Sequence, residues 1–175
     1  MQRTHRSAEA GFSLVEVLFA VLIVIFGVLG LAEVFTRGMI QMSSSQKDLL
    51  AKEKAAEAIE SVYSARDSGV VTWDQVANQG DGGIFVDGAQ TLNDPGPDGL
   101  VNTADDGGIE VLATPGPDNI LGTADDEITL LEGFTRDLII TDAGANLRQV
   151  QVVVAYLIGN ETRQYTVTTL IAAFA

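Results

Sequence analysis

Residues 11–32 read Gly-Phe-Ser-Leu-Val-Glu-Val-Leu-Phe-Ala-Val-Leu-Ile-Val-Ile-Phe-Gly-Val-Leu-Gly-Leu-Ala, and this stretch decides the fold of the chain. Only Ser13 and Glu16 interrupt the apolar run that extends from Phe12 to Ala32. A helix needs about 20 such residues to cross the hydrocarbon core of a bilayer. The sequence therefore predicts a membrane-spanning helix near the start of the chain.

The ten residues before this run are polar and include two arginines, Arg3 and Arg6. Basic residues before a span, followed by an acidic region after it, predict a single-pass topology with the N-terminus in the cytoplasm. A conventional signal peptide is cut at a small-residue site after its apolar core, whereas this run continues as a helical pattern. The order of the segments therefore argues against an ordinary secretory signal.

Glu16 is the unusual residue of the apolar run. A carboxylate near the centre of a membrane-spanning helix costs about 2.5–3.5 kcal/mol, and less near an interface. We expect such a residue to be functional and to pair with a cation, for which the freed α-amino group of a neighbouring chain is a candidate. The alternative is that the Glu16 side chain only reaches toward the lipid headgroups.

The segment Gly11-Phe12-Ser13-Leu14-Val15-Glu16-Val17-Leu18 resembles the class III signal motif of type IV prepilins and pseudopilins. The resemblance implies that a prepilin peptidase cuts between Gly11 and Phe12, so that residues 1–11 are a leader peptide. It also implies that the new N-terminal Phe12 is methylated. Glu16 would then pair with the N-terminus of an adjacent subunit and set the register of assembly.

The same resemblance implies the partners and the location of the chain. The implied partners are the prepilin peptidase, an inner-membrane assembly platform and other pilin subunits, which meet through their N-terminal helices. The subunit would start in the inner membrane and end in a periplasmic or extracellular filament. The ending Tyr165–Ile171 is similar to the last strand of PilV-type minor pilins and of type II secretion pseudopilins.

The apolar run continues without a proline into an amphipathic pattern, which predicts one helix over 12–66 with a membrane and assembly part at 12–32. Gly69 is expected to end it. Apolar residues at three-, four- and seven-residue steps predict the face that covers a sheet: Met39, Met42, Leu49, Ala56, Ile59 and Tyr63. Charged residues are expected on the opposite face: Lys47, Asp48, Lys52, Glu53, Lys54, Glu57 and Glu60.

Residues 67–135 hold all four prolines, are rich in Gly and Asp and lack Lys and Arg, which predicts a loop-dominated region. Short strands are expected within it at 83–86, 109–112 and 128–131. Residues 136–175 predict antiparallel strands joined by a turn at 159–162, with one apolar face formed by Val150, Val152, Val154, Tyr156 and Ile158. The predicted fold class is α+β, with a long N-terminal helix packed on a C-terminal antiparallel sheet, as in pilins.

Two 13-residue segments, 94–106 and 114–126, share Pro-Gly-Pro-Asp and Thr-Ala-Asp-Asp at an offset of 20 residues. Carboxylates and carbonyls on a tightly turning chain are the ligands that Ca²⁺ prefers, and crowded acids without a base repel one another. We therefore expect calcium-binding loops with these ligands: Asp94, Asp98, Asp105, Asp106, Asp118, Asp125, Asp126 and Glu127. Neither copy is an EF-hand, and the alternative is solvated turns in which Asp bonds to its own backbone.

Composition argues against several classes of function. The formal net charge of −14 disfavours a nucleic-acid partner, because phosphate binding requires a positive surface. The chain has no cysteine, and its only histidine, His5, lies in the expected leader, so a mature chain would lack Ser-His and Cys-His catalysis. We therefore expect no enzyme. The leading hypothesis is a minor pilin or pseudopilin, and the alternative is a calcium-binding adhesin or surface module tethered by an uncleaved anchor.

Overall fold

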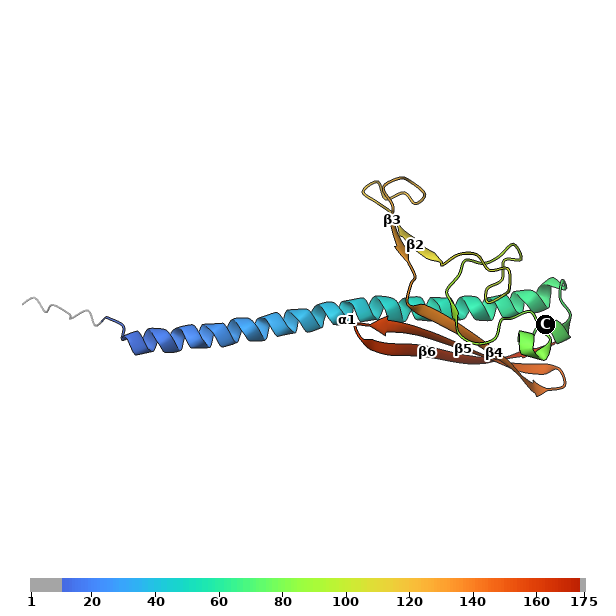
Figure 1. Cartoon of the computed structure of the whole chain (residues 1–175), viewed down its shortest axis with the longest axis horizontal. Coiled ribbons are helices and arrows are strands. Elements are labelled where there is room, and N and C mark those ends of the chain that lie inside the picture. Colours follow the sequence, from blue (N-terminus) through green and yellow to red (C-terminus); the bar gives the residue numbers. More distant parts are fainter. Residues whose placement is uncertain (1–10, 174–175) are drawn as a thin grey trace, which may run out of the picture. The chain divides into compact units, whose positions relative to one another are not determined.

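The computed structural model describes residues 11–173, and for Ser43 it describes the backbone alone. Apart from Gly11, the expected leader therefore lies outside the described residues. The chain divides into two compact units, Met1–Met42 and Ser43–Ala175. One long helix, α1, spans Leu14–Ser68, and all the strands lie in the second unit (Figure 1). The predicted α+β class, with a long N-terminal helix and an antiparallel sheet, is confirmed.

Both ends of α1 have a local cause in the sequence. At the start, the backbone N–H of Val15 donates to Ser13 Oγ at 3.3 Å, so Ser13 caps one of the free donors of the first turn. At the other end, Gly69 takes a left-handed φ of +65°, which a glycine adopts without a steric penalty and which stops the helix. The helix begins and ends two residues later than the interval 12–66.

The main sheet has four strands in the order β1-β4-β5-β6, and every pairing in it is antiparallel. Its strands are β1 (Gln90–Thr91), β4 (Phe134–Gly144), β5 (Leu147–Ile158) and β6 (Glu161–Ala172). A separate two-stranded hairpin consists of β2 (Val111–Thr114) and β3 (Glu127–Leu130). Two short 3-10 helices, η1 (Trp73–Gln75) and η2 (Gln79–Asp81), follow α1.

One predicted strand, at 83–86, is not formed. Phe85 is fully buried and makes only an isolated bridge with Asn78. Its N–H donates to the carbonyl of Ala77, and its carbonyl accepts from Gln79 N–H, so a compact turn uses the backbone groups that a strand would need. A Cβ on Gly83 would collide with the backbone of Ala77, which shows how tightly this turn is closed.

The face of α1 that covers the sheet matches the predicted one only in part, because Ile59 and Tyr63 pack against the core but other predicted residues do not. The buried residues of the helix in the second unit follow steps of four and three and are mostly alanine: Ala51, Ala55, Ala58, Val62 and Ala65. Leu49 and Ala56, which were expected to face the sheet, are exposed, whereas Lys54, expected on the charged face, is buried. Small side chains let the helix axis approach the sheet closely, and larger ones on this face would hold the two layers apart.

The sheet supplies the other side of the core by strict alternation. The strand β5 buries Val150, Val152, Val154 and Tyr156, as expected. The neighbouring strand β4 buries Phe134, Leu138 and Ile140 in the same way. The exception in this apolar set is Arg136, which is fully buried at an inward position of β4. A buried arginine in a core strand needs partners, and those partners lie in the loop region described below.

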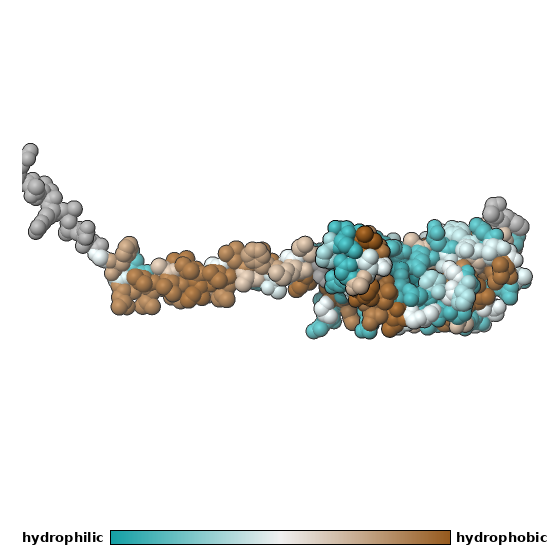
Figure 2. All heavy atoms as spheres, turned by 90° about the horizontal axis from the view of Figure 1, so that it is seen from above, coloured by the Kyte–Doolittle hydropathy of each residue, from teal (hydrophilic) through white to brown (hydrophobic). Residues whose placement is uncertain are grey.

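Every residue from 11 to 42 is exposed in the described structure, although most of them are apolar. Figure 2 shows this segment as an apolar rod, whereas the surface of the second unit is mostly hydrophilic. Within the described residues, α1 is the one helix that is long and apolar enough to cross a membrane. A helix that is apolar around its whole circumference needs lipid or other helices around it.

Candidate functional site

The first candidate site is the N-terminal end of the apolar segment. Gly11, Phe12 and Ser13 precede α1, and Glu16 lies in its first turn. Phe12 is exposed, and so is the Glu16 carboxylate, which has no hydrogen bond or ion pair within residues 11–173. An acid in the first turn is favoured there because the helix N-terminus carries partial positive charge. Glu16 is therefore free to accept a cation from another molecule.

The other acid among residues 11–42 is placed differently. Glu33 accepts a hydrogen bond from Arg37, one turn later on the same helix, at 2.6 Å. That pair is satisfied within its own chain, whereas Glu16 is not. The difference makes Glu33 a natural control for Glu16 in any experiment on assembly.

The second candidate site is the pair of repeated loops, which share one fold at an offset of 20 residues. In each copy the first Asp of the shared motif accepts from the N–H two residues on: Leu100 N to Asp98 and Ile120 N to Asp118, both 2.8 Å. The last Asp accepts at 2.8 Å and 2.6 Å in the two copies, from Asn102 N in the first and from Gly122 N in the second. The bonds to Asp98 and Asp118 are Asx-turn bonds, and the bonds to Asp106 and Asp126 tie the end of each loop back to its middle.

The threonine and the remaining aspartate of each copy also match. Thr103 Oγ1 donates to Asp105 at 2.8 Å, and Thr123 Oγ1 donates to Asp125 at 2.6 Å. The Thr123 hydrogen bond is the main reason that the pKa of Asp125 lies below its ordinary value, although partial desolvation opposes the shift. The carboxylates of both loops therefore organise their own backbone.

Each Pro-Gly-Pro-Asp motif needs its glycine because another backbone segment of the loop passes close to it. A Cβ on Gly96 would lie 2.5 Å from the carbonyl oxygen of Asp105, and a Cβ on Gly116 would be closer still to that of Asp125. Residues 99 and 119 both take a left-handed φ, as Gly99 at +70° and Asn119 at +56°. Glycine and asparagine are the residues that adopt this conformation most readily, so the same turn forms with glycine in the first copy and with asparagine in the second.

The two loops differ in their surroundings. In the first copy Leu100 and Val101 are buried, and the N–H of Val101 donates to Ser61 Oγ of α1 at 3.2 Å. In the second copy the equivalent residues, Ile120 and Leu121, are 59% and 60% exposed at the end of the β2–β3 hairpin. The same folded loop is thus docked once on its own domain and presented once to the outside (Figure 1).

A buried polar network fastens the first loop to the domain. Arg136 Nε donates to Asn102 Oδ1 at 2.6 Å, and its Nη1 donates to the carbonyl of Lys54 at 3.3 Å and lies 3.7 Å from Glu57. The ammonium of Lys54 pairs with Glu110 and also with Glu57, at 2.9 Å. The network joins α1, β4, the first loop and the start of the hairpin.

The electrostatics of this network follow from its burial. Burial lowers the pKa of Arg136, and the carboxylates of Glu57, Asp106 and Glu110 act against that shift. Burial also lowers the pKa of Lys54, but the bonds to Glu110 and Glu57 outweigh it and leave the pKa raised. Both bases are therefore held in their charged forms by acids that they in turn neutralise.

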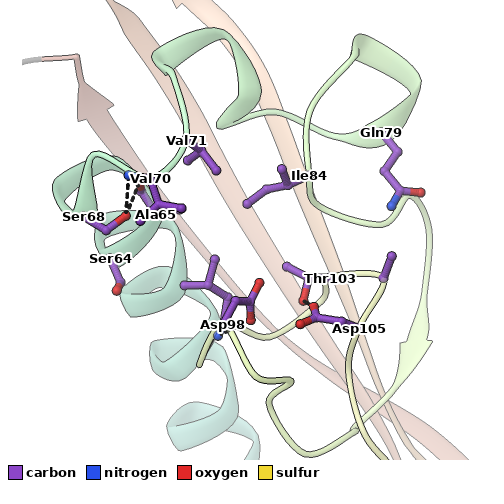
Figure 3. Close-up of a pocket in the computed structure, with 12 residues that line it drawn as sticks. Ser64, Ala65, Ser68, Val70, Val71, Gln79, Ile84, Asp98, Thr103 and Asp105 are labelled. Carbon is purple, nitrogen blue, oxygen red and sulfur yellow. Dashed lines mark hydrogen bonds between the residues drawn. The ribbon is translucent and has the colours of Figure 1, made fainter.

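A half-open cavity of about 560 Å³ lies beside the first loop (Figure 3). Its lining is mostly apolar and includes Val70, Val71, Ile84 and Leu100, with Asp98, Thr103 and Asp105 on the loop side. The dashed lines in Figure 3 mark the bond from Thr103 Oγ1 to Asp105 and the bonds that Ser68 Oγ makes with the Ala65 carbonyl and with Val70 N–H. Because the polar groups on the loop side already bond within the loop, the cavity offers an apolar surface and few free polar contacts.

The predicted calcium ligands lie in two separate places, the first four in the loop docked on α1 and the others in the loop at the hairpin end. Glu127 is the first residue of β3, and its carbonyl accepts from Thr114 Oγ1 at 3.3 Å. Within residues 11–173 no three His, Cys, Asp or Glu side chains gather as a group that could hold a metal ion.

Sequence reasoning missed the network residues Arg136, Asn102 and Glu110. A signal for Arg136 was present, because it ends the base-free region and falls at an inward position between Phe134 and Leu138 in an alternating strand. Its partners could not be read from the sequence, since they lie 34 and 82 residues away.

No known protein family, curated protein or solved structure matches this chain in the comparisons made with its sequence and fold.

Proposed function

We propose that this chain is a filament subunit of the type IV pilin class, either a minor pilin or a pseudopilin of a type II secretion filament. In this proposal it is cut after Gly11, methylated at Phe12 and assembled through its N-terminal helix. The observation that carries the proposal is the helical segment 14–42, with apolar side chains exposed on all sides and an unpaired acid, Glu16, in its first turn.

Such a helix can be stable in two environments. In a bilayer its apolar surface faces lipid, and in a filament the same surface faces the helices of other subunits. An uncompensated charge is expensive in either apolar environment, so Glu16 favours the arrangement in which a cation meets it. The freed α-amino group of Phe12 on a neighbouring subunit supplies that cation and thereby sets the register.

The N-terminus of the mature protein tests the first step. Mass spectrometry of protein purified from its native membrane should find chains that begin at Phe12 and carry one added methyl group. Chains that still begin at Met1 would refute processing and would favour the alternative, a surface module tethered by an uncleaved anchor. That alternative draws support from the exposed loop at the end of the β2–β3 hairpin.

Glu16→Ala tests the register step, with Glu33→Ala as the matched control. Both variants should insert in the membrane, but only Glu16→Ala should be depleted from sheared filaments. Glu33 is satisfied by Arg37 on its own chain, so its loss removes a local pair alone. Equal incorporation of the two variants would show that Glu16 has no role in assembly.

As part of the same proposal, Ca²⁺ stabilises the two Asp-rich loops. Their carboxylates lie in a region without any base from 67 to 135, and hard cations favour oxygen ligands on turning chain segments. Thermal unfolding of the full chain should shift upward with millimolar Ca²⁺ and much less with Mg²⁺, whose octahedral demand suits such loops poorly. An unchanged melting temperature would reduce both repeats to solvated turns.

A further inference from the structure

The β2–β3 hairpin carries an apolar face that is open to solvent. Val111 pairs with Leu130 and Ala113 pairs with Ile128, and residues paired directly across two strands share a face. All four are exposed in the described structure. The other face is mixed, with Leu112, Thr114, Glu127 and Thr129. A two-stranded hairpin is only marginally stable in water, so this face is expected to be covered in the working protein.

The internal repeat indicates what kind of surface covers the hairpin end. Its first copy docks Leu100 and Val101 against a helix face of small residues on α1, and its second copy presents Ile120 and Leu121 with no such surface beneath them. The first copy therefore shows how this loop can dock, with a pair of adjacent apolar residues packed on a face of α1.

The second unit has another stripe on α1, which begins at Leu49 and is exposed. Leu49 is 68% exposed, and Lys52 and Ala56 continue the stripe at the next turns. Beside it lies a shallow hollow of about 360 Å³, lined by Asp48, Lys52, Tyr156, Arg163, Gln164 and Tyr165. We call this stripe and hollow, together with Lys47, the basic surface. Lys47 is included because its ammonium donates to the carbonyl of Leu157 at 2.7 Å, and Leu157 directly follows Tyr156 of the hollow.

The charges of the two surfaces are complementary. The hairpin and its end carry Asp118, Asp125, Asp126 and Glu127 and no base. Among the described residues of the second unit, Lys52 and Arg163 are the exposed bases. Asp48 also faces the hollow and accepts a hydrogen bond from the Tyr156 hydroxyl, so the basic surface holds three bases, Lys47, Lys52 and Arg163, and one acid. Opposite potentials on two patches of one protein favour contact between copies and fix its orientation.

We propose that the β2–β3 hairpin of one copy docks on the basic surface of a second copy of this chain. The contact joins two different patches, so each copy keeps one free hairpin and one free basic surface. Such heterologous contacts extend into helical assemblies unless the rotation closes a ring. This contact depends neither on cleavage after Gly11 nor on the pairing of Glu16, and it can be tested without either.

Disulfide crosslinking of the full chain in its membrane tests the contact, and the natural absence of cysteine removes background. Leu121→Cys and Leu49→Cys are placed on two differently tagged copies expressed together, and Gln149→Cys replaces Leu49→Cys in the control. Gln149 is exposed on β5 but lies outside the basic surface. Oxidation should give a heterodimer with Leu49→Cys and none with Gln149→Cys, and the double variant L49C/L121C should give a ladder of larger species.

Charge reversal supplies the second arm. Lys52→Glu and Glu127→Lys should each abolish the crosslink between Leu121→Cys and Leu49→Cys, and the two reversals on opposite partners should restore it. Restoration shows that neither reversal acts by unfolding the chain. Equal crosslinking at Gln149, absence of the heterodimer at Leu49, or linkage only between two Leu121→Cys chains would each overturn the proposal.

Discussion

Leu100→Ala and Ile120→Ala remove apolar side chains from equivalent positions of one repeated loop, and we expect them to differ sharply in their effect on stability. Leu100 of the first loop is 7% exposed, whereas Ile120 of the second loop is 59% exposed. Each substitution deletes three side-chain carbons from the same folded loop, so the environment is the main variable.

The magnitudes follow from burial. At about 0.8 kcal/mol per buried methylene, the transfer of three carbons from water is worth roughly 2.4 kcal/mol at Leu100, and the cavity left behind raises the cost into the range of about 2–5 kcal/mol. At Ile120 most of the side chain is already in water and no closed cavity forms, so the expected cost is below about 1 kcal/mol.

Urea unfolding of the full chain in detergent measures both values. The single Trp73 is the probe, because it lies in the second unit with the Arg148 guanidinium 4.7 Å from its ring centre. Leu100→Ala should lower the midpoint, and Ile120→Ala should leave it nearly unchanged. Equal losses for the two variants would refute the assignment of one loop to the core and the other to the surface.

Three further predictions use the same assay. Arg136→Met should destabilise the second unit by about 3–5 kcal/mol, since it leaves Asn102 Oδ1 and the Lys54 carbonyl without their donor and removes a positive charge beside Glu57. A neutral result would show that the network is dispensable. Gly96→Ala should cost about 1–3 kcal/mol by collision with the loop backbone, whereas Gly116→Ala should perturb only the exposed loop and leave the Trp73 transition in place. Burial and the hydrogen bond to Asp48 raise the pKa of Tyr156, so the fold favours the neutral hydroxyl. The stability that this hydroxyl contributes is lost as the pH rises above about 10. Tyr156→Phe should therefore be less stable at neutral pH but decline less at alkaline pH, and a decline identical to that of the original chain would contradict this role.

The helix stripe shows where periodicity alone is insufficient. Leu49 and Ala56 follow the same seven-residue step as Met42 and Tyr63, so the sequence favours them as the core face, yet Leu49 is exposed. The stripe that packs on the sheet is the alanine-rich one through Ala51 and Ala58. A pattern of apolar residues reveals that a helix has two faces, but which face meets the sheet depends on how closely the partner layer can approach.

The loop region shows the same limit in another form. The repeat and its turn chemistry are visible in the sequence, because Gly, Asn and Asp at fixed offsets dictate the same local hydrogen bonds in both copies. The burial of Leu100 and the exposure of Ile120 are not visible, since two nearly identical local sequences reach opposite environments. The calcium ligands and the role of Glu16 stay predictions, because they concern groups from outside the chain.

The sequence by itself determined the elements that depend on neighbours along the chain. These are the apolar helix, its end at Gly69, the alternating strands of the sheet and the closed turns of the two loops. Only the tertiary structure decided which helix face is covered, that Arg136 is buried among acids, and which copy of the repeat is docked. The physical reason is range: backbone geometry and side-chain period act over a few residues, whereas burial and ion pairing depend on segments that are brought together from across the chain.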